Sequence, residues 1–228
     1  MIYPRYCLGC GQDAPEAFKY LCYDCWSDQT KVQLPFCSCC GDPILGAVEH
    51  AFSCYRCSSM PPSYKMARSA VRYSGGIVDL IKRFKYQHAF YLTDDLVTWL
   101  SALVETAFLH ESFSAIVPVP LHAQRQRERG YNQSSILARG LAKRMKIRWH
   151  RPWLFRVHPT TAQTHLTQPQ RISNVAGAFE ADGSCAKKYR SVLLVDDVMT
   201  TGATVEACAK ALCRAGVESV CVATIARG

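Results

Sequence analysis

Residues 192–204 of this 228-residue chain read Val192-Leu193-Leu194-Val195-Asp196-Asp197-Val198-Met199-Thr200-Thr201-Gly202-Ala203-Thr204. The first four residues are apolar and enter a loop, which predicts a buried, parallel strand. Asp196 and Asp197 stand at the carboxyl end of that strand, where open α/β sheets place their ligands. A threonine-rich turn then opens a helix, which we expect over about residues 205–215 and which closes at Gly216. The stretch therefore predicts an α/β fold built on a parallel sheet.

The turn after this strand is suited to a phosphate group, because hydroxyls and free backbone amides at a helix N-terminus attract anions. The residues that would supply them are Thr200, Thr201, Gly202, Ala203 and Thr204. Two carboxylates beside a phosphate repel it unless the ligand also offers hydroxyls or metal-bound oxygens. A ribose 5-phosphate meets both conditions, with its phosphate on the turn and its 2- and 3-hydroxyls on Asp196 and Asp197. The motif is not a Walker loop, because the Gly-Lys-Ser/Thr ending is absent.

The net charge of +9 is concentrated in one window of the chain. Residues 121–156 contain ten basic residues against Glu128 alone, whereas the segments before and after are nearly neutral. The ten are Arg125, Arg127, Arg129, Arg139, Lys143, Arg144, Lys146, Arg148, Arg151 and Arg156. An anionic partner is therefore expected at this window, either the phosphates of a small molecule or a nucleic acid.

A second buried strand precedes the basic window. It is expected within Ala115-Ile116-Val117-Pro118-Val119-Pro120, where the prolines interrupt it. We expect Arg125, Arg127 and Arg129 on a basic loop after this strand, followed by a helix that Ser134 caps and that ends near residue 145.

The rest of the window offers contacts for a nucleic acid. The candidates are Tyr131, Arg139, Lys143, Arg144, Lys146 and Arg148. For the basic residues the alternative is an ordinary solvated face. Aromatic side chains among arginines suit single strands, but for Trp153 and Phe155 we expect burial in the core instead.

The first 60 residues form a cysteine module. Nine of the 13 cysteines lie within residues 1–57, and eight of them form four Cys-x-x-Cys pairs. Such pairs hold tetrahedral zinc in chains that lack an export signal. We expect two structural zinc ions in successive ribbons, bound by Cys7, Cys10, Cys22 and Cys25 and by Cys37, Cys40, Cys54 and Cys57. Interleaved ligation, an iron–sulfur cluster and reduced cysteines without metal remain alternatives, and Cys39 and His50 are not needed as ligands.

This module is poorly suited to hold nucleic acid. Residues 1–60 carry four basic and six acidic residues, and zinc-bound thiolates would add negative charge. A structural role or docking to a protein is favoured. Pro61 and Pro62 interrupt the chain between this module and the remainder. We therefore expect a double zinc ribbon at 1–60 and an α/β domain at 64–228.

Membrane and secreted classes are not expected. The apolar stretch Leu96–Val104 ends at Glu105, well short of the ~20 residues that a membrane helix needs. No apolar segment follows Met1, so no secretory signal is expected. The expected compartment is the cytoplasm.

Residues 192–204 resemble the phosphoribosyl-diphosphate signature of type I phosphoribosyltransferases, without gap or mismatch. Nearly the whole chain resembles one group of that superfamily, the ComF family, through the cysteine pairs and four further motifs. These are Leu80-Ile81-Lys82-Arg83-Phe84-Lys85-Tyr86, Val117–His122, Arg129-Gly130-Tyr131-Asn132-Gln133, and the run from Thr161 to Phe179. Family members usually have Phe where Tyr131 stands.

The resemblance implies a type I phosphoribosyltransferase domain that binds phosphoribosyl diphosphate with Mg²⁺, in a family implicated in natural transformation. Asp196 and Asp197 would orient the ribose, and the arginines of the basic loop would neutralise the departing diphosphate. The acceptor is not implied. A glutamine-dependent amidophosphoribosyltransferase is disfavoured, because such enzymes use an N-terminal cysteine and residue 2 is Ile2.

A non-enzymatic alternative remains open. The chain could act as an adaptor for single-stranded DNA, in which the same pocket senses a nucleotide or holds phosphates without catalysis. Other DNA-uptake proteins are the implied protein partners.

Overall fold

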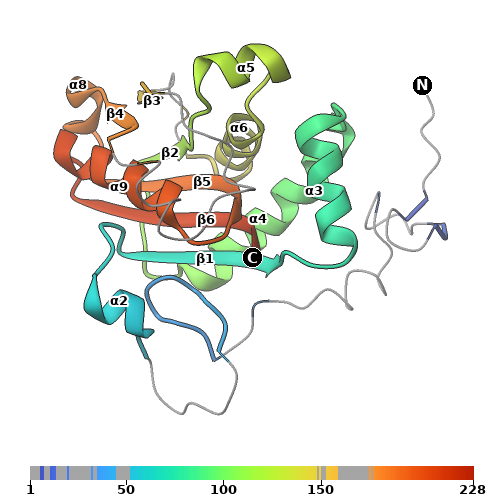
Figure 1. Ribbon diagram of the computed structural model, residues 1–228, viewed down its shortest axis with the longest axis horizontal. Coiled ribbons are helices and arrows are strands. Elements are labelled where there is room, and N and C mark those ends of the chain that lie inside the picture. Colours follow the sequence, from blue (N-terminus) through green and yellow to red (C-terminus); the bar gives the residue numbers. More distant parts are fainter. Residues whose placement is uncertain are drawn as a thin grey trace.

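The computed structural model describes residues 6–7, 11–13, 20, 32, 35–44, 52–147, 149, 153–158, 175 and 177–228. Its centre is a sheet of four parallel strands in the order β1-β6-β5-β2 (Figure 1). The strands are β1 (Met66–Arg72), β2 (Ala115–Pro118), β5 (Ser191–Met199) and β6 (Ser219–Arg227). This arrangement, with helices on both faces, confirms the expected α/β class.

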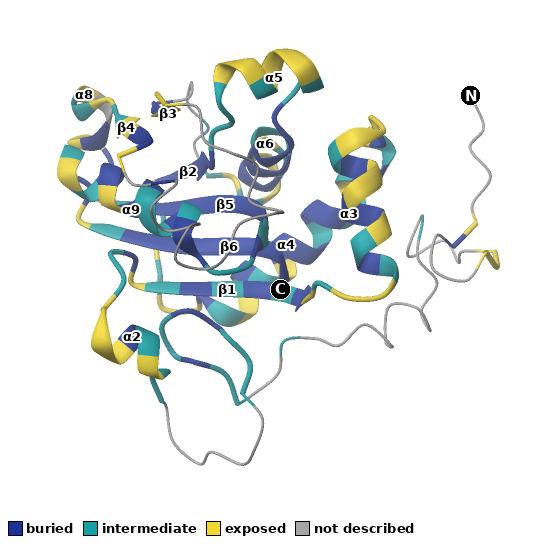
Figure 2. Cartoon of the chain, viewed as in Figure 1, coloured by how far each residue is buried: buried dark blue, intermediate teal, exposed yellow. Residues whose placement is uncertain are grey.

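The central strands bury both of their faces, as Figure 2 shows by their dark colour. In β5, Val192 and Leu194 belong to one core cluster, whereas Leu193 and Val195 belong to the other. Successive side chains of a strand point to opposite faces, so this continuous apolar run supplies two cores at once. The apolar stretch at 192–195 was therefore a reliable signal of a central parallel strand.

Helices between residues 76 and 145 cover one face of the sheet. They are α3 (Gly76–Tyr86), α4 (Thr93–Ala107) and α6 (Gln133–Met145), with the short 3₁₀ turn η1 (Phe90–Leu92) between the first two. Their buried residues share a core cluster with Leu193 and Val195. None of the described helices is both long and apolar enough to cross a membrane.

The other face carries α9 (Ala203–Ala215), the antiparallel pair β3 (Leu154–Arg156) and β4 (Phe179–Ala181), and α8 (Gly183–Ala186). The cysteine knuckle, residues 37–42, lies on this side as well. Cys37, Cys40 and Cys57 share a core cluster with Val192 and Leu194 of β5. Helix α2 (Tyr55–Ser59) follows that knuckle and leads into β1 (Figure 1). The domain division at residues 60–64 stays a prediction.

Several local predictions were wrong. Helix α9 begins at Ala203, two residues before the expected start. Asn132, and not Ser134, caps α6, since its side chain accepts a hydrogen bond from the amide of Ser134. The basic residues 125–129 lie on a helix, α5 (Ala123–Arg129), and not on a loop. Their alternation with polar residues hides the helix, because no apolar stripe marks it.

Candidate functional site

A pair of buried carboxylates lies at the carboxyl end of β5. Asp196 is 9% exposed and Asp197 is 3% exposed. Both belong to the strand itself, in which Asp196 is in register with Thr224 of β6. Because neighbours on a strand face opposite ways, Asp197 points to the same side as Val195, toward α3. The sheet edge thus presents two acids in different surroundings.

Asp196 is held by the first turn of α6. Its Oδ1 accepts hydrogen bonds from Ser134 Oγ at 2.7 Å and from the amide of Asp197 at 2.9 Å. Burial and the neighbouring charge of Asp197 nevertheless raise the pKa of Asp196 to about 7. This acid therefore changes protonation near neutral pH. Ser134 acts here as a partner of Asp196, a role that the capping prediction missed.

Asp197 is paired with Lys85, the penultimate residue of α3. Lys85 Nζ lies 3.0 Å from Asp197 Oδ1, and the lysine side chain is 20% exposed. Burial opposes the lysine charge, but the two carboxylates outweigh it and raise the pKa of Lys85. The other carboxylate oxygen, Asp197 Oδ2, is buried and has no hydrogen-bond partner within the part of the chain that the structure describes. Lys85 lies in a motif of the resemblance, yet no role for it could be assigned from sequence.

The threonine turn shares a small hollow with Asp196. This hollow of about 30 Å³ is lined by Asp196 and by residues 198–205, so it includes all five predicted phosphate-binding residues. Gly202 has a φ of +78°, a backbone conformation that glycine adopts without the strain that a side chain would cause. The amide of Ala203 donates to Thr201 Oγ1 at 3.4 Å, within the turn that opens α9.

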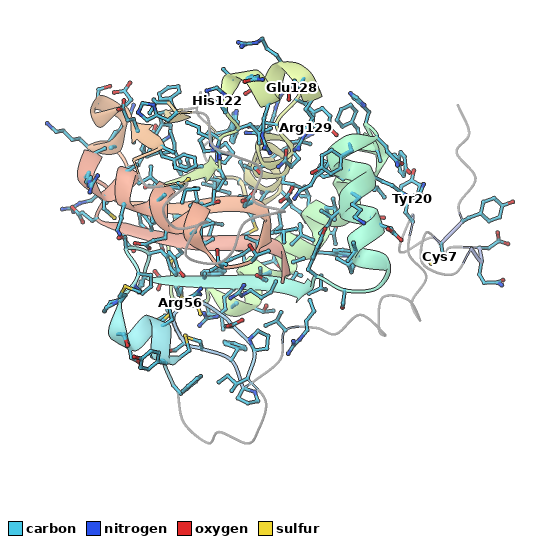
Figure 3. The ribbon with its side chains drawn as sticks, viewed as in Figure 1. Cys7, Tyr20, Arg56, His122, Glu128 and Arg129 are labelled. Carbon is cyan, nitrogen blue, oxygen red and sulfur yellow. The ribbon has the colours of Figure 1, made fainter. Side chains whose placement is uncertain are left out.

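Helix α5 has no buried residue, and Figure 3 labels Arg129 at its C-terminal end. Arg129 donates to Gln133 Oε1 at 2.5 Å and lies over the Tyr86 ring at 4.9 Å, which holds it between α5 and the end of α3. Arg127 is exposed and Arg125 is half-buried. The structure gives no contact between these three predicted diphosphate ligands and the carboxylates among the interactions of the described residues.

Arg156 of β3 is half-buried and lies over the Phe179 ring at 5.4 Å. Burial and the charge of Arg125 lower its pKa, which Cys208 and Asp196 raise in part. Arg156 was counted in the basic window but given no role.

The predicted nucleic-acid contacts separate into two kinds. Tyr131 donates its hydroxyl to the carbonyl of Phe84 and packs against His88 and Phe90, with ring centroids 5.2 and 4.8 Å away. It therefore has a structural role between α6 and α3. The basic residues Arg139, Lys143, Arg144 and Lys146 are all exposed, and Arg148 lies outside the described residues.

Trp153 and Phe155 differ in burial. Trp153 is 3% exposed and packs against Tyr189 at 5.8 Å, as expected for a core residue. Phe155 is 46% exposed, so its predicted burial was wrong. In the short strand β3 the side chain of Phe155 points away from the cluster that buries its neighbour Leu154.

Cys37, Cys40, Cys54 and Cys57 form a candidate zinc centre. Their sulfur atoms all lie within 4.8 Å of one another, and Cys40 Sγ lies 3.8 Å from Cys54 Sγ. A tetrahedron of zinc–sulfur bonds about 2.3 Å long has edges of about 3.8 Å, so the cluster fits this metal. The third and fourth pairs are together, as the sequential arrangement requires. Cys39 lies outside the cluster and contacts Ser53 Oγ at 3.6 Å.

Backbone amides surround the sulfur of Cys37. The amide of Cys54 donates to Cys37 Sγ at 3.3 Å. Burial opposes ionisation, but amides of Cys54, Cys40 and Cys39 outweigh it and lower the pKa of Cys37 to about 7. These amides thus favour the thiolate at Cys37, the form in which a cysteine binds a metal.

The first proposed ribbon lies mostly outside the described residues. Cys7 is buried, whereas Cys10, Cys22, Cys25 and His50 are not described. The described part has the same backbone turn as the second ribbon. The carbonyl of Cys7 accepts a hydrogen bond from the amide of Gly11 at 2.8 Å, and the carbonyl of Cys37 accepts one from the amide of Gly41 at 2.9 Å.

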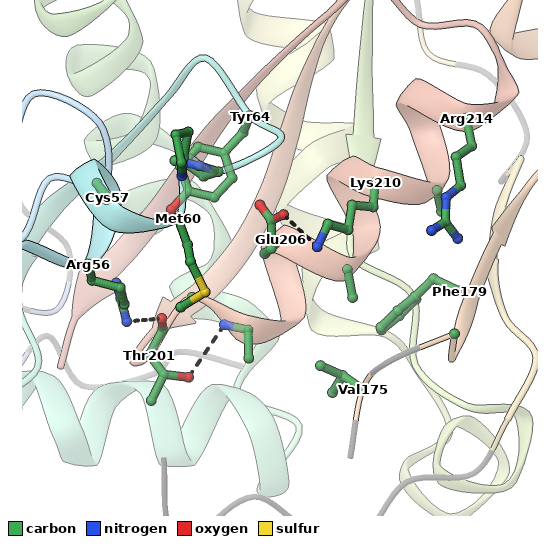
Figure 4. A pocket seen from close by; sticks show the side chains of 17 residues that line it. Arg56, Cys57, Met60, Tyr64, Val175, Phe179, Thr201, Glu206, Lys210 and Arg214 are labelled. Atoms are coloured by element: carbon green, nitrogen blue, oxygen red, sulfur yellow. Dashed lines mark hydrogen bonds and ion pairs between the residues drawn. The ribbon is translucent and has the colours of Figure 1, made fainter. Parts of the chain in front are cut away.

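A larger pocket of about 320 Å³ lies behind the turn, between α2, Pro61, Pro62 and α9 (Figure 4). Its walls are mostly apolar, and neither Asp196 nor Asp197 is among the described residues that line it. Asp196 therefore lines the smaller hollow and not this pocket.

Comparison with known proteins accounts for both halves of the chain. Residues 1–58 match a double zinc ribbon domain, and residues 132–228 match a phosphoribosyl transferase domain. The chain is 33% identical to competence protein F of Haemophilus influenzae over 97% of this chain and 96% of that one. It is 29% identical to the DNA utilization protein YhgH of Escherichia coli, over 91% of this chain and 90% of that one. It is also 27% identical to competence protein ComFC of Bacillus subtilis, over 86% of this chain and 79% of that one.

Proposed function

Since the chain belongs to the ComF family, we propose that it binds phosphoribosyl diphosphate with Mg²⁺ and acts as a phosphoribosyltransferase in DNA uptake and use. The relatives' names support the biological setting, because they refer to competence and to DNA utilization. The acceptor of the phosphoribosyl group is left open.

One observation carries this proposal: the carboxylate pair and the threonine turn share the same end of β5. The hollow of about 30 Å³ joins Asp196 to the turn. A ligand with only a phosphate would meet repulsion from the two acids. A ligand with a phosphate and two ribose hydroxyls satisfies the turn and the acids together, and Asp197 Oδ2 is a buried acceptor that a hydroxyl could satisfy.

Three groups of residues have separate roles in the transfer. Thr200, Thr201, Gly202, Ala203 and Thr204 hold the 5-phosphate. Asp196 and Asp197 accept from the ribose hydroxyls, and their charge favours the cationic ribose that develops as diphosphate leaves. Arg125, Arg127 and Arg129 of α5 neutralise the leaving group once α5 closes toward the turn. Mg²⁺, when bound, would neutralise part of the charge of the diphosphate.

Calorimetric titration with phosphoribosyl diphosphate and Mg²⁺ tests the site. Asp196→Asn combined with Asp197→Asn should weaken binding well over tenfold, because each charge-assisted hydrogen bond is worth roughly 1.5–3 kcal/mol. The control is Asp79→Asn, which changes an exposed carboxylate on α3. Equal affinity in the double variant and in the wild type would exclude this site.

A second candidate function is binding of single-stranded DNA without catalysis. The observation that favours it is an exposed basic face on α6: Arg139 and Lys143 lie four residues apart on the helix, Lys146 caps its C-terminal end, and all three are exposed. Release of diphosphate in the presence of acceptors supports the enzyme. Strand binding by a protein that does not turn over phosphoribosyl diphosphate supports the adaptor.

We also infer two structural zinc ions per chain. The repeated knuckle geometry supports this, since both Cys7 and Cys37 are followed by a glycine with positive φ, +75° at Gly11 and +66° at Gly41. Elemental analysis should find two zinc ions, and Cys22→Ser should remove about one. A single zinc ion in the wild-type protein would refute the zinc site in the first ribbon.

The domain limits and the compartment complete the proposal. We place the double zinc ribbon at 1–60 and the phosphoribosyltransferase domain at 64–228, with function in the cytoplasm, where thiolates stay reduced for zinc.

A further inference from the structure

The cysteine knuckle reaches the phosphate turn through Arg56. This arginine lies on α2 between Cys54 and Cys57, two of the four clustered cysteines. Its Nη1 donates to the carbonyl oxygen of Thr201 at 2.5 Å (Figure 4). The contact joins residues 145 positions apart in the chain, so it links the metal module directly to the turn.

A second arginine holds the turn from the end of β6. Arg227 Nη1 donates to the carbonyl of Met199 at 2.9 Å and also to the carbonyl of Thr200. Its Nη2 lies 3.0 Å from Asp42 Oδ1, and Asp42 follows the knuckle glycine Gly41. The arginine side chain is 4% exposed, so this ion pair ties a buried cation to the knuckle.

Three consecutive carbonyls of the turn are therefore bound by two arginines. In a planar trans peptide the carbonyl of one residue and the amide of the next point in opposite directions. Holding the carbonyls of Met199, Thr200 and Thr201 consequently orients the amides of Thr200, Thr201 and Gly202 to the other side. Successive amides that point one way form a concave anion site. The hollow beside Asp196 is lined by these residues, and by neither arginine among the described residues.

The positions of Arg56 and of Asp42, the partner of Arg227, depend on the clustered cysteines. The amide of Ala67 in β1 donates to the carbonyl of Cys39 at 2.7 Å, so the knuckle lies along the edge of the sheet. Four thiolates within 4.8 Å of one another repel unless a cation neutralises them. A bound zinc ion therefore fixes the knuckle that carries Asp42 and the helix that carries Arg56.

We propose that Arg56 and Arg227 are positioning residues through which the zinc-loaded second ribbon sets the amides of the phosphate turn, so that metal loading and binding of a 5-phosphate ligand strengthen each other. The proposal rests on the proposed function for the identity of the ligand. The coupling is reciprocal, as any linkage between two binding sites must be. The zinc ribbon then serves the ligand site directly, in addition to stabilising its own fold.

Arg56→Ala is the decisive variant, and Tyr55→Ala is its matched control, since Tyr55 is 88% exposed on the same helix. Arg56→Ala should keep the wild-type zinc content and raise the dissociation constant for Mg²⁺ and phosphoribosyl diphosphate roughly tenfold. Arg56→Lys should restore part of the affinity. Asp42→Asn, a change at a half-exposed side chain, should weaken binding by a smaller factor.

Amide hydrogen exchange gives a readout that needs no ligand. Residues 199–204 should exchange faster in Arg56→Ala than in the wild type or in Tyr55→Ala, with zinc bound in all three. Unchanged exchange there, in a variant that keeps its zinc, overturns the coupling. If the wild-type protein does not bind phosphoribosyl diphosphate, the proposed function fails while exchange still decides the coupling. Unchanged ligand affinity in Arg56→Ala, with normal wild-type binding, also overturns it.

Discussion

Lys85 Nζ lies 3.0 Å from Asp197 Oδ1, so the ligand-free site carries its own counter-ion. The lysine comes from the last turn of α3 and the aspartate from the end of β5, which ties the helix layer to the sheet at the point where the ligand is proposed to bind. Asp197 Oδ2 is left as a buried acceptor, unpaired among the described groups.

Lys85→Met should destabilise the protein by about 2–3 kcal/mol at pH 8, because removal of one partner leaves a buried carboxylate without its cation. Urea unfolding of the wild type and the variant at pH 8 measures this loss. Lys82→Met, an exposed lysine on the same helix, should change stability by less than about 0.5 kcal/mol. Equal losses for both lysines would contradict an energetic role for the pair.

Asp196 should make the ligand-free protein less stable as the pH rises. Its pKa in the folded protein is about 7, against 3.8 for the ordinary group, so the folded state holds the proton more tightly than the unfolded chain. Between pH 4 and 7 the folded state therefore binds more protons, and the free energy of unfolding falls with increasing pH. The loss attributable to this acid is on the order of 2–4 kcal/mol, at about 1.4 kcal/mol per pKa unit.

Asp196→Asn should remove this pH dependence and keep the acceptor for Ser134. Urea unfolding of wild type and variant at intervals from pH 4.5 to 8 gives the difference directly. Asp79→Asn serves as the control, because that carboxylate is exposed. Parallel stability curves for wild type and Asp196→Asn would show that the acid ionises normally.

Gly41→Ala should detach the knuckle from the sheet. Gly41 has a φ of +66°, and an added Cβ would lie 2.6 Å from the backbone oxygen of Ala67. Positive φ alone costs an alanine roughly 1–2 kcal/mol, and a clash with strand backbone adds to it. Gly11→Ala is the matched control, since Gly11 has a φ of +75° and no described residue lies within 4 Å of an added Cβ. Thermal unfolding should show a clearly larger loss for Gly41→Ala, and similar losses would argue against close packing of the knuckle on β1.

The parallel sheet and the turn that opens α9 could be predicted from sequence because both depend on local patterns, whereas the turn's role in binding phosphate stays a prediction. Residues 192–195 are a continuous apolar run, and the glycine and threonines of the turn have few other uses at a helix start. The four cysteines of the second ribbon could be grouped for the same reason, because ligand spacing is local.

The contacts that complete the site could not be predicted, because they join distant segments. Lys85, Ser134 and Arg56 each reach the end of β5 from a different part of the chain. Their own sequence surroundings explain them equally well as a helix-end lysine, a helix cap and an exposed arginine. Only the order of strands in the sheet brings them together. The burial of Phe155 was predicted wrongly for a different reason. A three-residue strand is too short for its sequence pattern to show which face is buried.

Single-stranded DNA, if it binds, should bind through the exposed basic face of α6. Replacing Arg139, Lys143 and Lys146 by Ala should make the dependence of log affinity on log salt shallower by about 0.7 for each phosphate that the protein no longer neutralises. Affinity for phosphoribosyl diphosphate should stay unchanged, because these residues lie outside the described carboxylate hollow. Fluorescence anisotropy with a labelled oligonucleotide at several salt concentrations measures the slope. Replacing Lys187, Lys188 and Arg190, three exposed cations before β5, controls for net charge. Equal slopes for the two triple variants would mean that general charge, and not the α6 face, governs binding.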